Sequence, residues 1–115
     1  MRRLPILAVL FASAFSLASH ASGDSTAQVD KLQSMYSQSD CIYFTLVGVS
    51  IADPSYPASG EWFAMSRGPT AESQDRLKRA YAMLLAARLS GTTLRVRTTG
   101  NLVCNYPEVQ DVFIW

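Results

Sequence analysis

The chain has 115 residues, of which 49% are hydrophobic and 17% are charged, and its formal net charge is +1. This length allows a single domain. The composition is that of a folded globular protein, and it excludes a disordered tail, a collagen-like repeat and a polybasic nucleic-acid binder. Two cysteines are too few for a cysteine-rich scaffold or a four-cysteine zinc site.

Residues 1–21 have the layout of a secretory signal peptide. Arg2 and Arg3 supply the positive start, residues 4–17 are almost entirely apolar, and Ala21 ends a run of small residues suited to cleavage. The alternative, a membrane anchor, is disfavoured because the apolar run is shorter than the roughly 20 residues that span a bilayer. We therefore expect a secreted or periplasmic protein with no membrane span.

Removal of residues 1–21 also removes the only histidine, His20. A chain without histidine lacks the usual base of Ser-His-Asp and Cys-His mechanisms and a common metal ligand. The carboxylates are scattered and no phosphate-binding glycine loop is present. We expect a non-enzymatic protein with no catalytic residue, no cofactor and no metal, and a hydrolase is the disfavoured alternative.

Export favours a disulfide between the two cysteines, Cys41 and Cys104. Such a bond closes a loop of about 64 residues and contributes about 4 kcal/mol in the chain-entropy model. The alternative is a pair of free thiols with a redox role. The sequence disfavours it because the two cysteines do not form a Cys-x-x-Cys motif.

Residues 22–40 form a polar N-terminal segment for which two interpretations stay open, a docked short helix and a loose tail. A capping-box pattern begins at Ser25, and Val29, Leu32 and Met35 fall at helical spacing. This pattern slightly favours the helix.

Residues 41–115 are expected to form the single domain, and it begins with two strands. Residues 42–51 are dense in β-branched and aromatic side chains, which predicts a buried strand with a bulge or bend at Gly48. A turn-rich connection over residues 53–60 leads to a second, antiparallel strand over residues 61–66.

Residues 71–90 predict a long helix. Thr70 is the expected N-cap and Gly91 the expected left-handed C-cap. We expect Arg88 to meet the carbonyl groups at the helix C-terminus rather than a ligand. The side chains that should face the core are Leu77, Ala80, Tyr81 and Leu84.

The second half of this helix is apolar around most of its circumference. The residues that extend the apolar surface outward include Met83, Leu85, Ala86 and Leu89. Two interpretations stay open. Alanines are good helix formers that a surface tolerates, or the outer face packs against another copy of the protein and these four residues form the interface of a homo-oligomer.

Residues 93–99 alternate between apolar and polar side chains, as in a half-exposed strand. Leu94 and Val96 should face the core, and Arg95 and Arg97 should face solvent. The two arginines then share one exposed face. They are suited to hold a carboxylate or a phosphate, and the alternative is an ordinary solvated strand face.

A turn at Gly100 and Asn101 and a last strand over residues 109–115 complete the chain, with Phe113 and Trp115 on one side of that strand. The order of elements predicts the α+β class, as a small antiparallel OB-like barrel crossed by one long helix and stapled by one disulfide.

The ring of Tyr56, beside the proline-rich loop, is a third candidate for ligand binding, because it is placed to stack on a sugar or on a partner.

The segments "EWFAMS", "RLKRAYAMLLAARLSG" and "TLRVRTTGNLVC" lie between residues 41 and 104. In pattern, this region resembles the OB-fold B subunits of AB5-type toxins, in the style of the pertussis, typhoid and subtilase cytotoxin branch. The resemblance implies an exported, glycan-binding subunit that forms a ring, a pentamer, with the helices along the ring axis. It would account for the apolar helix, but none of the family's sugar-contacting residues matches a numbered position here.

The function expected from the sequence is an exported binding module that recognises a glycan or an exported protein. The alternative is a monomeric periplasmic inhibitor or protein-interaction domain that acts through an exposed loop such as residues 53–60.

Overall fold

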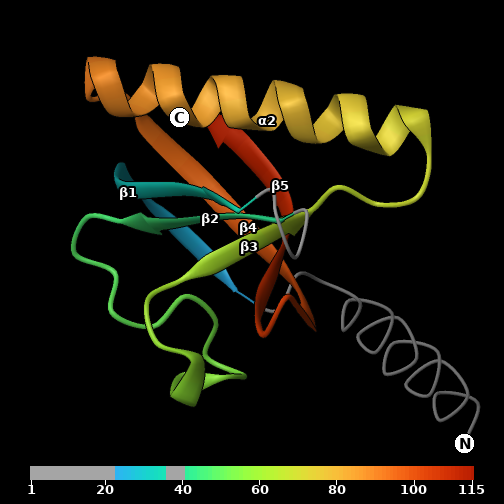
Figure 1. Cartoon of the computed structure of the whole chain (residues 1–115). Helices are drawn as coiled ribbons and strands as arrows, with labels where there is room; N and C mark the ends of the chain where they lie inside the picture. The colour runs from blue at the N-terminus through green and yellow to red at the C-terminus, as the bar shows by residue number, and fades with distance from the viewer. Residues whose placement is uncertain (1–22, 36–40) are drawn as a thin grey trace, which may run out of the picture.

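The computed structural model describes residues 23–35 and 41–115, and the expected signal peptide lies outside them. Five strands form a closed barrel in the order β1-β2-β3-β5-β4, and one long helix lies across it (Figure 1). The α+β, OB-like fold class is therefore confirmed. In chain order the elements are β1 (Asp24–Met35), β2 (Cys41–Leu46), η2 (Pro57–Ser59), β3 (Phe63–Ser66), α2 (Ala71–Ser90), β4 (Thr93–Val103) and β5 (Tyr106–Ile114).

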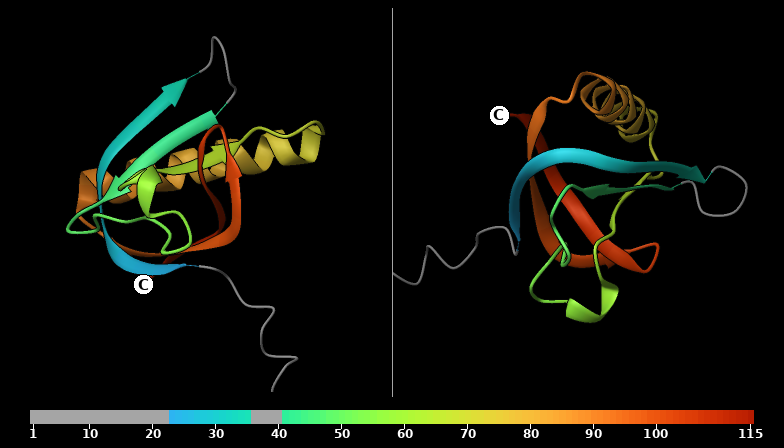
Figure 2. Two further views of the ribbon diagram at one scale, coloured as in Figure 1. Left: turned by 90° about the horizontal axis from the view of Figure 1, so that it is seen from below. Right: turned by 90° about the vertical axis from the view of Figure 1, so that its left-hand side faces the viewer.

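The barrel closes through one parallel contact among antiparallel ones. β1 pairs antiparallel with both β2 and β4, and β3 is antiparallel to β2 as expected. β5 is antiparallel to β4 and meets β3 in parallel at the pair Ala64 and Glu108. The right-hand view of Figure 2 shows the strands curving round beneath α2.

The helix expected in the polar N-terminal segment is wrong, because residues 24–35 form β1. The strand register shifts between Val29 and Leu32, so both side chains face the barrel interior although they are three residues apart. That spacing imitates one face of a helix. β1 pairs on both sides, so the barrel begins before residue 41, where the domain boundary was expected.

The barrel core is built around two stacked rings, Phe44 and Phe63, whose centroids are 5.1 Å apart. β2 ends at Leu46, earlier than expected, because the backbone turns there. The amide of Val49 donates to the carbonyl of Leu46, and Gly48 has a φ of 78°, so this glycine lies in a turn after the strand. The remaining fully buried apolar side chains include Leu46, Leu84, Leu94 and Val96.

α2 begins and ends where the capping residues predict. The side chain of Thr70 accepts from the amide of Ser73, whose hydroxyl in turn accepts from the amide of Thr70, which completes a capping box. Gly91 has φ 69° and ψ 25°, the left-handed C-cap expected from the sequence. Gly68 also has a positive φ, and a Cβ there would lie 2.6 Å from the Ser73 oxygen, so the approach to the helix requires glycine.

Arg88 connects α2 to the barrel, which corrects its expected role at the helix C-terminus. Its Nε donates to the carbonyl oxygen of Asp30 in β1 at 2.8 Å. This bond holds the part of β1 that follows Val29 against the last turns of α2.

The tight turn between the last two strands lies at Cys104 and Asn105, whose φ angles are 51° and 72°. A two-residue hairpin loop with positive φ at both positions matches the twist of its strands. The turn expected at Gly100 and Asn101 is therefore wrong. Both residues belong to β4, where the pairing register with β5 shifts between Thr98 and Leu102.

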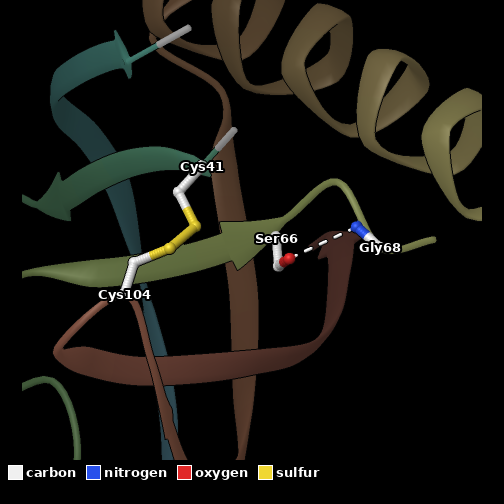
Figure 3. The surroundings of a disulfide bond; sticks show 4 residues. All are labelled: Cys41, Ser66, Gly68 and Cys104. Carbon is white, nitrogen blue, oxygen red and sulfur yellow. Dashed lines mark hydrogen bonds between the residues drawn. A yellow bond between two sulfur atoms is a disulfide. The ribbon is translucent and has the colours of Figure 1, made fainter. Parts of the chain in front are cut away.

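Cys41 and Cys104 form the expected disulfide. Figure 3 shows the bond joining the start of β2 to the β4–β5 turn, beside the end of β3, where Ser66 Oγ accepts from the amide of Gly68. The crosslink ties the hairpin of β4 and β5 to the opposite side of the barrel.

Candidate functional site

The two candidate arginines lie side by side on the outer face of the barrel. Leu94 and Val96 are fully buried, so Arg95 and Arg97 project outward from β4, as expected from the alternation. In the strand register Arg97 lies opposite Asp24 of β1 and opposite Asp111 of β5. The arginines therefore occupy the central strand of a three-stranded surface.

Each guanidinium is bound by a carboxylate from a neighbouring strand. Arg95 Nε donates to Asp24 Oδ1 at 2.9 Å and its Nη2 donates to Oδ2 of the same carboxylate at 2.5 Å. Arg97 donates through Nε and Nη2 to Asp111 Oδ2. These are charge-assisted contacts, and the first is a parallel two-bond pair with a fixed orientation.

The Arg95–Asp24 pair also changes the titration of both groups. The hydrogen bonds from Arg95 hold the pKa of Asp24 below its usual 3.8, the charges of Arg95 and Arg97 act in the same direction, and desolvation opposes them. The same hydrogen bonds raise the pKa of Arg95. Both side chains are partly exposed, so solvent screens the pair and its contribution to stability is small.

Two aromatic residues complete this surface, Phe113 of β5 and Trp115 directly after it, and neither was expected from the sequence to bind a ligand. The guanidinium carbon of Arg95 lies 5.0 Å from the ring centroid of Trp115, and that of Arg97 lies 5.1 Å from the ring centroid of Phe113. Both distances suit cation–π stacking. We call the surface made by Asp24, Arg95, Arg97, Asp111, Phe113 and Trp115 the arginine–aromatic face.

Tyr56 lies apart from the arginine–aromatic face. Its hydroxyl donates to the carbonyl oxygen of Gly100 at 2.6 Å, further along β4. The same loop is held at its start by Asp53, a buried residue whose carboxylate accepts from Thr98 Oγ1 and from the amide of Ser55. Tyr56 thus fastens the loop of residues 53–60 to the barrel.

The outer side of α2 divides into a charged half and an apolar half. Leu84 and Ala87 of the helix are buried against the barrel. Leu85 is 40% exposed and Leu89 is 75% exposed, and Ala82 and Ala86 are exposed beside them. The exposed residues nearer the N-terminus of the helix are mostly charged, and they include Glu72, Asp75, Arg76, Lys78 and Arg79.

Met83 lies at the edge of the apolar half, over a groove between α2 and the end of β5. The groove has a volume of about 210 Å³ and its other lining residues are Ala86, Ala87, Ser90, Thr92 and Ile114. In Figure 1 the β5 arrow ends close to the underside of α2. Of the four residues expected at an oligomer interface, Met83 and Ala86 thus line this groove, and Leu85 and Leu89 are exposed on the same half of the helix.

A hollow of about 320 Å³ lies between the first half of α2 and strands β3 and β5, and Arg76 and Glu108 are among its polar lining residues. Neither Arg95 nor Arg97 lines it. The arginine–aromatic face is therefore an open surface separate from this hollow.

No family model matches the chain, and no curated protein matches it. Among solved structures, a similar fold occurs in a human heat-labile enterotoxin in complex with a blood group A antigen analog, with a TM-score of 0.61 and 11% sequence identity. The match covers 90% of this chain and 95% of that chain. At this identity the likeness shows the fold alone, and it supports the resemblance to OB-fold toxin subunits at that level.

Within residues 23–35 and 41–115, no helix combines the length and the apolar character needed to cross a bilayer.

Proposed function

We propose that this chain is an exported, non-enzymatic binding module that assembles with copies of itself through α2 and recognises glycans. The observation that carries the proposal is the apolar half of the outer face of α2. The barrel itself is compatible with such a role, since the enterotoxin that shares its fold was solved with a blood group antigen analog.

The apolar half of α2 has a clear energetic consequence. Fully burying a leucine side chain stabilises a complex by about 1.5–3 kcal/mol relative to leaving it exposed. Leu85 and Leu89 lie one turn apart, so a second helix is able to cover both at once. A ring, a pentamer by the resemblance, places this face of every subunit against a neighbour.

Export is supported by the disulfide and by the signal-peptide pattern of residues 1–21. A disulfide persists in oxidising compartments and is rare in the cytosol. The bond between Cys41 and Cys104 is therefore the state expected of a secreted or periplasmic protein.

A panel of immobilised glycans tests the proposed ligand class. The processed, oxidised chain should bind a defined subset of the glycans, and the same chain after reduction and alkylation serves as the control. Binding to no glycan at micromolar protein would contradict the proposal.

Assembly should act on this binding through avidity. The double substitution Leu85→Gln and Leu89→Gln should weaken capture on densely printed glycans while leaving affinity for one soluble saccharide unchanged. Lys78→Gln, on the charged half of the same helix, is the matched control. Equal loss of glycan capture in both variants would show that the apolar half of α2 does not contribute to avidity.

The loop of residues 53–60 favours a second candidate, a protein-binding domain such as a monomeric inhibitor. The amide of Ala52 donates to the carbonyl of Gly60, which closes the base of the loop, and Tyr56 ties its middle to β4. Pro54, Ser55 and Pro57 are exposed on this fixed frame. A partner protein recovered from the periplasm at one copy per monomer would favour this candidate over the first.

A further inference from the structure

The arginine–aromatic face brings guanidinium groups and aromatic rings together on one surface. β4 supplies Arg95 and Arg97, and the end of β5 and the residue after it supply the rings of Phe113 and Trp115, whose centroids lie 5.0–5.1 Å from the guanidinium carbons. Arg95 is the register partner of Phe113 and Arg97 that of Asp111, so each guanidinium lies over the ring two residues beyond its own register partner. The result is an open platform of rings bordered by hydrogen-bonding groups.

The platform is exposed and held in place. Trp115 is 68% exposed and Phe113 is 38% exposed, so solvent reaches both rings. The amide of Trp115 nevertheless donates to the carbonyl of Thr93 at 2.9 Å, which extends the β4–β5 pairing to the last residue. This bond fixes the backbone at Trp115, and Arg95 lies over one face of the indole ring. The exposure of Trp115 leaves the other face of the ring available to a ligand.

The charges of the face cancel. Two guanidiniums, on Arg95 and Arg97, are bound by two carboxylates, on Asp24 and Asp111. An incoming anion would have to displace or approach these carboxylates, which disfavours a carboxylate or a phosphate ligand. An uncharged ligand with many hydroxyl groups meets no such barrier, because the pairs offer both donors and acceptors at fixed positions.

We propose, building on the glycan-binding function proposed above, that the arginine–aromatic face is the binding subsite for an uncharged sugar ring. The sugar's apolar C–H face stacks on the indole of Trp115, and the ring of Phe113 extends the platform to a neighbouring unit. Its hydroxyl groups bond to the Arg95–Asp24 and Arg97–Asp111 pairs. This differs from the expectation that the two arginines hold an anion, and it leaves Tyr56 outside the subsite.

The test measures the affinity for one soluble neutral oligosaccharide, chosen from those that the wild-type chain binds on the glycan panel. Trp115→Ala should lower this affinity about tenfold or more, as expected for an aromatic anchor. Trp115→Phe should keep most of it, because a ring remains. Leu102→Ala is the matched control, since Leu102 is an apolar residue of β4 that is 47% exposed and belongs to neither the arginine–aromatic face nor the α2 groove.

The salt dependence is a second readout. Binding of a neutral sugar to a face without net charge should change little as ionic strength rises, whereas an anion held by arginines would be released. Retention of wild-type affinity in Trp115→Ala, or a salt-sensitive preference for sialylated or sulfated glycans, would overturn the subsite and leave the glycan-binding function standing. Binding of no glycan by the wild-type chain would overturn both.

Discussion

Leu84 and Leu89 allow one substitution to be compared at two positions of the same helix. Leu84 is fully buried in the core beneath α2, and Leu89, on the outer face, is 75% exposed. Leu84→Ala removes buried methyl groups and leaves a cavity, which should lower the free energy of unfolding by about 3 kcal/mol. For a domain of this size that loss corresponds to a fall in Tm of about 15 °C.

Leu89→Ala makes the same change in helix propensity without a cavity, so the unfolding free energy of the monomer should stay within about 0.5 kcal/mol of wild type. If the outer face is an interface, the wild-type chain gains apparent stability as protein concentration rises, and Leu89→Ala gains less. Urea denaturation followed by circular dichroism at several protein concentrations measures both effects. Equal losses at the two positions, independent of concentration, would refute the assignment of inner and outer faces.

Three further variants test other contacts of the fold. Cys41→Ser with Cys104→Ser should cost about 4 kcal/mol of unfolding free energy, measured by denaturant titration, because the unfolded chain loses its crosslink. Thr70→Ala should cost about 1 kcal/mol in the same assay through loss of the helix cap, and no change would contradict the capping box. Asp24→Asn should destabilise the protein slightly near neutral pH. Since Arg95 lowers the pKa of Asp24 in the folded state, the carboxylate's contribution is present above its ordinary pKa of 3.8 and is lost as pH falls through the lowered value. The difference between the two proteins should therefore disappear in acid, and a constant difference would exclude the ion pair as its cause.

The predictability of α2 and the error at β1 have opposite causes. α2 is bounded by local chemistry, a Thr70 cap and a Gly91 that adopts the left-handed conformation, so its limits follow from the sequence. β1 is polar and carries a bulge between Val29 and Leu32, and its pairing with two other strands decides its conformation. Nonlocal hydrogen bonding of this kind is not encoded in the spacing of apolar residues along one segment.

The position of the β4–β5 turn was missed for a related reason. Gly100 and Asn101 are common turn residues, but the structure keeps them in β4 and places the turn at Cys104 and Asn105. The disulfide bond from Cys104 reaches β2, so a cysteine occupies a turn position that composition alone assigns to glycine or asparagine.

The candidate site could be predicted only within single strands. Alternation along β4 indicated that Arg95 and Arg97 face outward, and alternation over residues 109–115 indicated that Phe113 and Trp115 lie on one side. The contact between the arginines and the rings depends on the register of β4 against β5, in which Arg95 pairs with Phe113. Asp111 joins the face through the same register and Asp24 through the pairing of β1 with β4, and no local pattern relates either carboxylate to the arginines.

The central claim, assembly through the apolar half of α2, is tested most directly by light scattering coupled to size-exclusion chromatography on the processed, oxidised chain. The account predicts a closed oligomer for the wild type and for Lys78→Gln, and a folded monomer for the double substitution Leu85→Gln and Leu89→Gln. A wild-type chain that elutes as a monomer at micromolar concentration would contradict it.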